Sequence, residues 1–471
     1  MNFLAIDLGA ESGRAMLGAV DGGRLTLEEL HRFPNAPVQL PTGLHWDALR
    51  LFHEIRKSLS ICGRQRSLSL DGVAVDTWGV DFALLDAHGA LLENPRHYRD
   101  SRHIGMLERT FAAAPRQRIF EQTGIQFLHI NSLCQWYSMR LDATPALGIA
   151  RHLLFMPDLF NFWLTGVVRA ELTVASTSQF LIPVENRWAT ALLRELGLDP
   201  ALLPEVVRPG TLLGSLLPEL QRGSGFSRPV PVYATAGHDT ASAVAAVPAE
   251  GSGWCYISSG TWSLLGAEID APVIDEDSLA LNFTNEAGAG GKIRLLKNLA
   301  GLWLLQECRR AWALEGRDYS YEQLAAMAAA APPSGTRIDP NAFSTPGNMP
   351  RQIAAHCRAT GQVCPEDPGA LARMILDSLA EAYRKTIGDL ERLIHRRIDV
   401  VHIVGGGSRN RLLNQLTANA TGRTVVAGPA EATAAGNVLV QAIGSGAVAG
   451  LDELRDIVRR SFTLETYRPS F

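Results

Sequence analysis

The chain has 471 residues, of which 46% are hydrophobic and 20% are charged, and its formal net charge at pH 7 is −4. This composition is ordinary for a globular protein, and the mild acidity without a polybasic run excludes a duplex nucleic acid as partner. No apolar run approaches the ~20 residues of a membrane span, and the N-terminus MNFLAIDLGAESGR lacks the basic region of a signal peptide. We therefore expect a cytoplasmic protein that binds neither nucleic acid nor membrane.

Two similar β-hairpins are predicted, one in each half of the chain. Within residues 2–20, the apolar runs FLAIDLG and RAMLGAV flank the turn AESG. Residues 253–269, GWCYISSGTWSLLGAEI, repeat the pattern of strand, Ser/Gly/Thr turn and strand. Because each hairpin opens about half of the chain, the repeat predicts a duplicated domain. The breakers Pro248 and Gly251 mark a linker, so we predict an N-terminal domain over residues 1–247 and a C-terminal domain over residues 248–471.

The remaining segments predict alternating strands and helices. LDGVAVDTWGVDFALLDAHG, residues 70–89, reads as a strand, and PVPVYATAGHD, residues 229–239, as a strand that ends in an acid. In the second half, residues 371–394 have the period of an amphipathic helix. The buried strand DVVHIV then runs into three glycines and the helix RNRLLNQLTANATG, and a helix rich in small residues begins near Glu431. The sum is an α/β protein of two mixed-sheet domains with a cleft between them.

Three Gly-bearing turns follow predicted strands: GAESGR, SSGTWS and VGGGSRN. Backbone N–H groups in such turns bind anions, and a strand, a glycine turn and a helix N-terminus form a phosphate site. One such turn carries little weight, since glycine is the default turn residue. Three of them favour a nucleotide, together with the hydroxyls of Ser12, Ser259, Thr261 and Ser408. Four common motifs of nucleotide, hydrolase and zinc sites are absent: G-x-x-x-x-G-K-[ST], G-x-G-x-x-G after a strand, G-x-S-x-G and H-E-x-x-H. The remaining prediction is that two hairpin turns together bind a phosphate group.

The stretch TAGHDTASA, residues 235–243, places Asp239 among small residues. A buried carboxylate without a partner is costly. Asp239 is therefore either the cap of a helix that begins near Thr240 or a functional acid.

Seven segments resemble, in order and spacing, the sugar kinases of the FGGY family: DLGAESGR, VDTWGVDF, YRDSR, GHDTASA, SSGTWSL, LKNLAGLWLLQE and HIVGGGSRN. The resemblance covers nearly the whole chain. It implies two actin-like, ribonuclease H-like domains with ATP and sugar in the interdomain cleft. Three of these segments resemble the family members that phosphorylate L-rhamnulose at O1, rather than the xylulose, glycerol or fuculose kinases: DTWGVDF, YRDSR and KNLAGLWLLQE. An ATP-dependent ketose kinase with Mg²⁺ is thus implied.

Carried over by motif, the resemblance also assigns roles to residues. Asp239 would be the general base, and Asp7 would act on Mg²⁺ through water. The sugar contacts that it implies are Gly79, His238, Asp239, Thr240 and Asn298. The nucleotide contacts that it implies are Ala10, Glu11, Ser12, Gly13, Arg14, Thr261, Gln306, Gly405 and Gly406. Glu11 departs from the family's pattern, which has a hydroxyl residue there, and its carboxylate would repel the triphosphate unless a metal or Arg14 intervenes.

Other interpretations remain open at this level. An actin-like chaperone or filament ATPase would carry the same paired hairpins without a sugar-facing acid, and a kinase for another pentulose or deoxyhexulose would differ only in its pocket. By default, His238 would be a structural donor, Asn298 a turn residue and Gln306 an exposed polar side chain. We expect a monomer or a homodimer. The six cysteines have no C-x-x-C spacing and read as buried thiols, including the neighbours Cys357 and Cys364.

Overall fold

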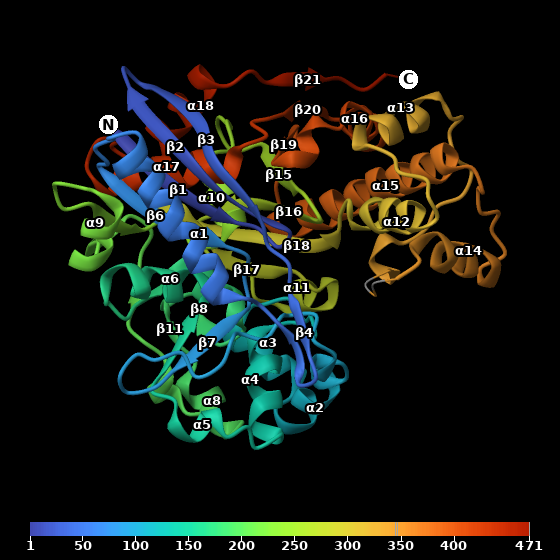
Figure 1. Cartoon of the computed structure of the whole chain (residues 1–471). Helices are drawn as coiled ribbons and strands as arrows, with labels where there is room; N and C mark the ends of the chain where they lie inside the picture. Colours follow the sequence, from blue (N-terminus) through green and yellow to red (C-terminus); the bar gives the residue numbers. More distant parts are fainter. Residues whose placement is uncertain (344, 346, 471) are drawn as a thin grey trace. The chain divides into compact units, whose positions relative to one another are not determined.

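The computed structural model describes residues 1–343, 345 and 347–470, which form two compact units. Unit 1 comprises Met1–Ala246, Glu268–Leu295 and Ala432–Ser461, and unit 2 comprises Val247–Ala267, Leu296–Glu431 and Phe462–Phe471 (Figure 1). Two later segments thus complete the unit that the N-terminal half begins. The predicted domain boundary at residue 247 and the cleft between the domains stay predictions.

Unit 1 is built on a six-stranded sheet in the order β13–β14–β6–β1–β2–β3. As predicted, β1 and β2 form an antiparallel hairpin, and β6 and β14 continue the sheet as parallel neighbours. The strands of this unit are β1 (Asn2–Leu8), β2 (Ser12–Asp21), β3 (Arg24–Pro34), β4 (Val38–Leu40), β5 (Gly43–His45), β6 (Gly72–Thr77), β7 (Phe82–Leu85), β8 (His152–Phe155), β9 (Ala170–Glu171), β10 (Leu181–Ile182), β11 (Arg187–Trp188), β12 (Val206–Val207), β13 (Thr211–Ser215), β14 (Pro231–Ala234) and β17 (Thr284–Ala287).

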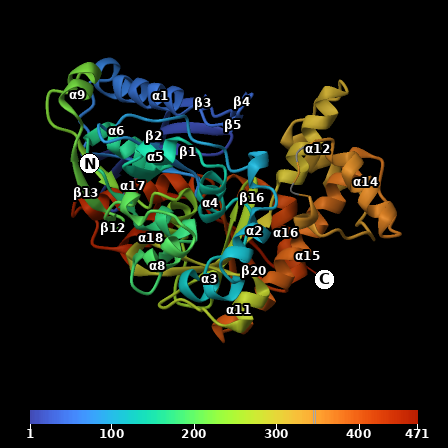
Figure 2. The ribbon, with the colours of Figure 1, turned by 90° about the horizontal axis from the view of Figure 1, so that it is seen from below.

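Helices cover both faces of this sheet. The side chains of Leu4 and Ile6 in β1 pack with Leu51 and Ile55 of α1 in one hydrophobic core, whereas α17 packs on β1 and β6 from the other face (Figures 1 and 2). A Cβ on Gly436 of α17 would lie 1.8 Å from the carbonyl oxygen of a residue in α10, so the small residues of this helix permit close packing. The helices of unit 1 are α1 (Ala48–Ser60), α2 (Met106–Ala113), α3 (Arg116–Thr123), α4 (Ser132–Leu141), α5 (Ala146–Ile149), α6 (Met156–Thr165), α7 (Leu172–Ala175), α8 (Thr190–Glu195), α9 (Pro218–Ser224), α10 (Asp239–Ala245), α11 (Glu276–Leu281), α17 (Ala432–Gly444) and α18 (Leu451–Ser461).

Unit 2 repeats the plan of unit 1. Its hairpin β15–β16 has β19 as a parallel neighbour of β15, and β20 follows as a parallel neighbour of β19. In unit 1, β1 likewise pairs antiparallel with β2 and parallel with β6, and β14 is a parallel neighbour of β6. This match confirms the predicted duplication. The other strands and the helices are β15 (Trp254–Ser259), β16 (Trp262–Ile269), β18 (Ile293–Ala300), β19 (Val400–Val404), β20 (Thr424–Ala427), β21 (Glu465–Tyr467), α12 (Trp303–Leu314), α13 (Tyr321–Ala330), α14 (Met349–Ala359), α15 (Pro368–Ile394) and α16 (Arg411–Thr421). In both Figure 1 and Figure 2, α12 and α14 lie side by side.

One prediction was wrong in its extent. Residues 70–89 are not a single strand but β6 and β7, which are separated by a tight bend. Val80 in this bend has a φ of 67°, in the left-handed region that β-branched residues avoid. Its N–H donates to Oγ1 of Thr177 at 3.2 Å, and its carbonyl oxygen accepts from Ser132 Oγ at 2.5 Å. These tertiary hydrogen bonds hold the break in place, and the sequence pattern does not show them.

Two further predictions concern the whole chain. Each of the six cysteines is a free thiol, including Cys357 and Cys364. No helix within the described ranges is long and apolar enough to cross a membrane.

Candidate active site

The parallel strands of unit 1 bring three acidic residues to one edge of the sheet. Asp7 in β1 is in register with Asp76 in β6, and the next residue of β6, Thr77, forms a parallel bridge with His238. The N–H of Thr77 donates to the carbonyl oxygen of Gly237 at 2.9 Å. Because carboxyl ends of parallel strands meet at the same edge, Asp239 follows β14 beside the other two carboxylates.

Asp239 is the first residue of α10, and His238 before it occupies the N-cap position. The helix-cap interpretation of Asp239 therefore does not describe this helix. Its side chain is 29% exposed and accepts hydrogen bonds from the N–H and the hydroxyl of Thr240. Burial and the negative charge of Asp7 raise the pKa of Asp239, against the lowering effects of His238 and Thr240. The carboxylate is thus both accessible and a stronger proton acceptor than a free aspartate.

Asp76 is a buried carboxylate. It is the first residue of the motif DTWGVDF, but the sequence analysis assigned it no role. Its Oδ2 accepts a hydrogen bond from Asn437 Nδ2 in α17, and its Oδ1 has no partner among the described residues. Burial raises its pKa well above the ordinary value, and the charges of Asp7 and Asp239 add to the rise.

The turn between β1 and β2 is the first predicted phosphate turn, and it contains residues 10–14, which the resemblance assigns to the nucleotide. Arg14 forms an ion pair with Asp7, and the turn is closed by the N–H of Gly9, which donates to the carbonyl oxygen of Ser12 at 3.0 Å. A Cβ on Gly13 would lie 2.2 Å from the ring of Phe33, so only glycine fits there. Glu11 is exposed, while Ala10, Ser12 and Arg14 are half-buried.

Gly79 lies where the resemblance implies a sugar. A Cβ at this position would be 3.1 Å from Thr177 Oγ1 and 3.4 Å from His238 Nε2. Gly79, His238, Asp239 and Thr240 therefore gather at the same edge as Asp7, whereas Asn298 belongs to unit 2.

Two further charged residues, missed by the sequence reasoning, contact His238. Glu286 Oε2 and Arg294 Nη2 lie 3.4 Å and 3.2 Å from its Nδ1, and an ion pair of 3.0 Å joins the two. Glu286 and Arg294 are opposite charges eight positions apart, on the strands β17 and β18, which is a weak signal that could have suggested this pair.

Asp81 organises the bend between β6 and β7. Its carboxylate accepts hydrogen bonds from the indole N–H groups of Trp46 (2.6 Å) and Trp78 (3.0 Å), from the Tyr98 N–H and from Gln135 Nε2. Burial raises its pKa to about 7, against the lowering effect of these hydrogen bonds. The acid therefore fixes Trp78 directly before Gly79.

The second phosphate turn, between β15 and β16, carries Thr261. Its carbonyl oxygen accepts from the N–H groups of Gly301 and Trp303, at 3.2 Å and 3.1 Å. A Cβ on Gly301 would lie 2.5 Å from the backbone of Trp262, so this approach of two backbone segments requires glycine.

The glycine turn after β19 lies against the same hairpin. Gly405 has a φ of 83°, and a Cβ there would lie 3.1 Å from the carbonyl oxygen of Ser259. Gly406 follows it with open space around the position of a Cβ. Gln306 is half-buried in the first turns of α12, and its Oε1 is buried without a hydrogen-bond partner among the described residues. Unit 2 thus brings Thr261, Gly405 and Gly406 to one region.

These features fit a nucleotide and a magnesium ion. The unpartnered Gln306 Oε1 is an acceptor available to a ligand donor, and the open backbone at Gly406 suits a phosphate or a base. Across residues 1–343, 345 and 347–470, no group of three or more His, Cys, Asp or Glu could hold a metal by itself. Mg²⁺ bound with nucleotides usually takes one or two carboxylates and fills its shell with water and phosphate oxygens. Asp7, near the end of β1, suits that mode as a single carboxylate.

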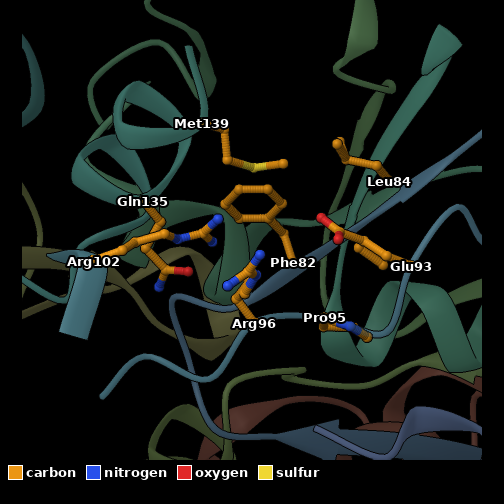
Figure 3. Close-up of a pocket in the computed structure, with 9 residues that line it drawn as sticks. Phe82, Leu84, Glu93, Pro95, Arg96, Arg102, Gln135 and Met139 are labelled. Atoms are coloured by element: carbon orange, nitrogen blue, oxygen red, sulfur yellow. The ribbon is translucent and has the colours of Figure 1, made fainter. Parts of the chain in front are cut away.

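A separate pocket in unit 1 does not contribute to this site. Its volume is about 10 Å³, room for about one water molecule. In Figure 3, the guanidinium groups of Arg96 and Arg102 lie beside the ring of Phe82. None of the residues that we predict for sugar or nucleotide lines it, and neither ligand would fit.

Family models match both halves of the chain. Residues 2–246 match the N-terminal domain of the FGGY family of carbohydrate kinases, and residues 255–445 match its C-terminal domain. The chain belongs to the FGGY family of carbohydrate kinases. This confirms the resemblance and the enzyme class, and kinases of this family use ATP.

Two curated relatives of this FGGY kinase are similar along almost their full length. A rhamnulokinase from Bacteroides thetaiotaomicron is 44% identical over 470 residues, which cover 99% of this chain and 96% of the relative. A rhamnulokinase from Enterococcus faecalis is 41% identical over 472 residues, with 99% and 94% covered.

Solved structures confirm the two-domain α/β fold with mixed sheets that the FGGY kinases share with actin-like ATPases. A ligand-bound xylulose kinase from Lactobacillus acidophilus superimposes with a TM-score of 0.81 at 15% identity, over 100% of this chain and 94% of that one. A glycerol kinase from Plasmodium falciparum, solved with ADP, gives a TM-score of 0.79 at 13% identity, with 100% and 94% covered.

Proposed function

We propose that this kinase transfers the γ-phosphoryl group of ATP to O1 of L-rhamnulose, giving L-rhamnulose 1-phosphate and ADP in L-rhamnose catabolism. The observation that carries the proposal is the accessible carboxylate of Asp239 beside His238 and Gly79, in a chain 44% identical to a rhamnulokinase. Several further rhamnulokinases are 37% to 41% identical along nearly the whole chain. The choice of L-rhamnulose as substrate is also supported by the motifs DTWGVDF, YRDSR and KNLAGLWLLQE.

Asp239 supplies the base in this proposal. Phosphoryl transfer needs an acceptor hydroxyl aligned with the γ-phosphate and a group that takes its proton. The raised pKa of Asp239 strengthens its carboxylate for that task, and general-base catalysis contributes about 10²–10⁴-fold. In the proposal, His238 and Thr240 hold the sugar beside Asp239, and Gly79 leaves room for it. Asn298 is the further sugar contact that the family resemblance implies.

The phosphate turns supply the electrostatics. Mg²⁺, when bound with ATP, neutralises charge on the β- and γ-phosphates. Asp7 would hold that ion, by the resemblance through water, and the backbone of residues 10–14 would bind the phosphates. Thr261 donates its hydroxyl to a phosphate, Gln306 reaches the nucleotide with its amide, and the backbone of Gly405 and Gly406 lies beside it.

The test is a ketose panel with product analysis. ADP release is measured with L-rhamnulose, L-fuculose, D-xylulose and D-ribulose, and with glycerol, at equal concentrations. We expect the highest kcat/KM with L-rhamnulose and a phosphorus NMR spectrum of the product that shows attachment at O1. Another acceptor preferred about tenfold, worth about 1.4 kcal/mol, or phosphate on another oxygen, contradicts the proposal. ADP release that ignores the sugar would instead indicate a filament or chaperone ATPase.

A further inference from the structure

Arg294 is the one large charged side chain among the most deeply buried residues of the described chain, with 0% exposure. Its Nε donates to the carbonyl oxygen of Ala287 at 3.0 Å, and its Nη2 contacts both Glu286 and His238. A buried arginine remains charged and therefore needs a carboxylate partner. Glu286 supplies the charge, and Arg294 lowers the pKa of Glu286 against the effect of burial. The pair is thus an ionised, fixed element of the site.

The contacts of His238 Nδ1 decide which ring nitrogen carries the proton. Guanidinium nitrogens only donate, and Arg294 Nη2 lies closer to Nδ1, at 3.2 Å, than Glu286 Oε2 does, at 3.4 Å. Glu286 Oε2 already accepts from the same Nη2 at 3.0 Å. A proton on Nδ1 could be donated to Glu286 only across the longer contact and would face the guanidinium donor, whereas a lone pair on Nδ1 accepts from Arg294 across the shorter one.

In a neutral imidazole, the nitrogen opposite an accepting Nδ1 carries the proton. His238 Nε2 lies 3.4 Å from Asp239 Oδ1 and 3.4 Å from the position of a Cβ on Gly79. An N–H there points toward the carboxylate and the space beside Gly79. With the other tautomer, a lone pair would face the carboxylate of Asp239, and the two acceptors would repel each other.

We propose that Arg294, held by Glu286, is a positioning residue that fixes His238 as the tautomer protonated at Nε2, so that this N–H serves Asp239 and a sugar oxygen. The contact with sugar rests on the proposed function. The tautomer does not, because it is a property of the protein without ligand.

The direct test is the tautomer of His238 in the wild-type protein. Long-range proton–nitrogen correlation spectra of ¹⁵N-histidine-labelled protein distinguish the two neutral forms, and the signal among the 12 histidines is assigned by its loss in His238→Asn. We expect the Nε2-protonated form in the wild type and a mixture in Arg294→Met. An Nδ1-protonated His238 in the wild type overturns the proposal, even if Arg294→Met fails to fold.

Kinetics give a second, independent readout. Arg294→Met should lower kcat/KM for the sugar about 10- to 100-fold, the usual cost of losing the group that orients a functional histidine, and leave the KM for ATP nearly unchanged. Arg294→Lys, which keeps a donor and the charge, should recover part of the loss. The matched control is Arg373→Met, which breaks the buried Arg373–Asp377 pair of 3.1 Å in unit 2.

The outcomes separate structural from positioning roles. Equal losses of sugar kcat/KM in Arg294→Met and Arg373→Met would mean that Arg294 only stabilises the fold. An unchanged tautomer in a folded Arg294→Met protein would also overturn the proposal. If L-rhamnulose proves a poor substrate while the tautomer is as expected, the proposed function fails and the positioning role of Arg294 stands.

Discussion

The carboxylate of Glu171 accepts a hydrogen bond from the N–H of Gly237 at 2.9 Å. Glu171 is buried, and its two oxygens also accept from the Thr173 N–H and hydroxyl and from the Val174 N–H. A single side chain therefore caps α7 and holds the residue two positions before Asp239. The backbone that carries the proposed base therefore depends on the buried carboxylate of Glu171.

Glu171→Gln should weaken this connection. The amide has one acceptor oxygen, and its NH₂ group would face donors, so we expect a loss of about 1–3 kcal/mol in the free energy of unfolding. Because Gly237 loses its partner, kcat/KM for the sugar should fall as well. Asp367→Ala removes the side chain that caps α15 in unit 2 and should destabilise by about 1 kcal/mol with an unchanged sugar KM. Urea unfolding and steady-state kinetics of both variants check this, and normal kinetics in Glu171→Gln would contradict it.

Asp239→Asn should abolish most turnover. The amide keeps the shape and cannot accept the proton, so we expect kcat to fall by at least about 10²-fold with ATP still bound. Asp275→Asn is the control, since Asp275 caps α11 and Asn caps about as well as Asp. A kcat near that of the wild type in a folded Asp239→Asn protein would show that Asp239 is not the general base.

Gly79→Ala should weaken the binding of the sugar without changing the binding of ATP. The added methyl group would lie 3.4 Å from His238 Nε2. One extra carbon in a closely packed site changes kcat/KM by about tenfold or more. We expect a raised KM for the sugar and an unchanged KM for ATP. Gly388→Ala is the matched control, because nothing lies within 4 Å of its Cβ position inside α15. Equal sugar KM values for the two variants would exclude Gly79 from the sugar site.

Glu11→Ser should change the response to magnesium. Glu11 is exposed on the first phosphate turn, and its charge would repel triphosphate directly. We expect the Mg²⁺ concentration at half-maximal rate to shift more than the sugar KM does. The exposed Glu366, changed to Ser, provides the control. An effect confined to sugar KM would refute this role of Glu11.

Asp81 predicts a pH dependence of stability. Its pKa of about 7 in the folded protein exceeds its ordinary value of 3.8. Between these values the folded protein holds a proton that the unfolded chain has lost, so raising the pH destabilises the fold until about pH 7. Asp81→Asn does not titrate. The stability of the wild type relative to this variant should fall by about 2–3 kcal/mol between about pH 5 and about pH 8, measured by urea unfolding. A difference that stays constant over this range would contradict the prediction.

The sequence predicted the elements whose signal is local. The two hairpins, the long helix α15 and the glycine turn after β19 follow from period and turn residues, and the quoted motifs led to the family. The partners of the site residues carry no such signal. Arg294 reads as one of two basic residues of its strand, and Asn437 reads as a polar residue in a helix of small residues. Their roles depend on contacts between distant segments, Asn437 with Asp76 across 361 positions. The L-rhamnulose preference, the site roles and the choice between monomer and homodimer stay predictions.

The place of α17 in unit 1 makes the first sheet depend on a segment that is synthesised much later than its strands. Gln441 Nε2 donates to the carbonyl oxygen of Leu4 in β1, 437 positions earlier, and α17 covers one face of that sheet. The ribosome makes β1 before α17, so the sheet lacks the cover of α17 until residues 432–444 have been made. A broken message or an early stop therefore yields a product without the helix that holds Asp76, and that product has exposed apolar surface that chaperones and proteases recognise.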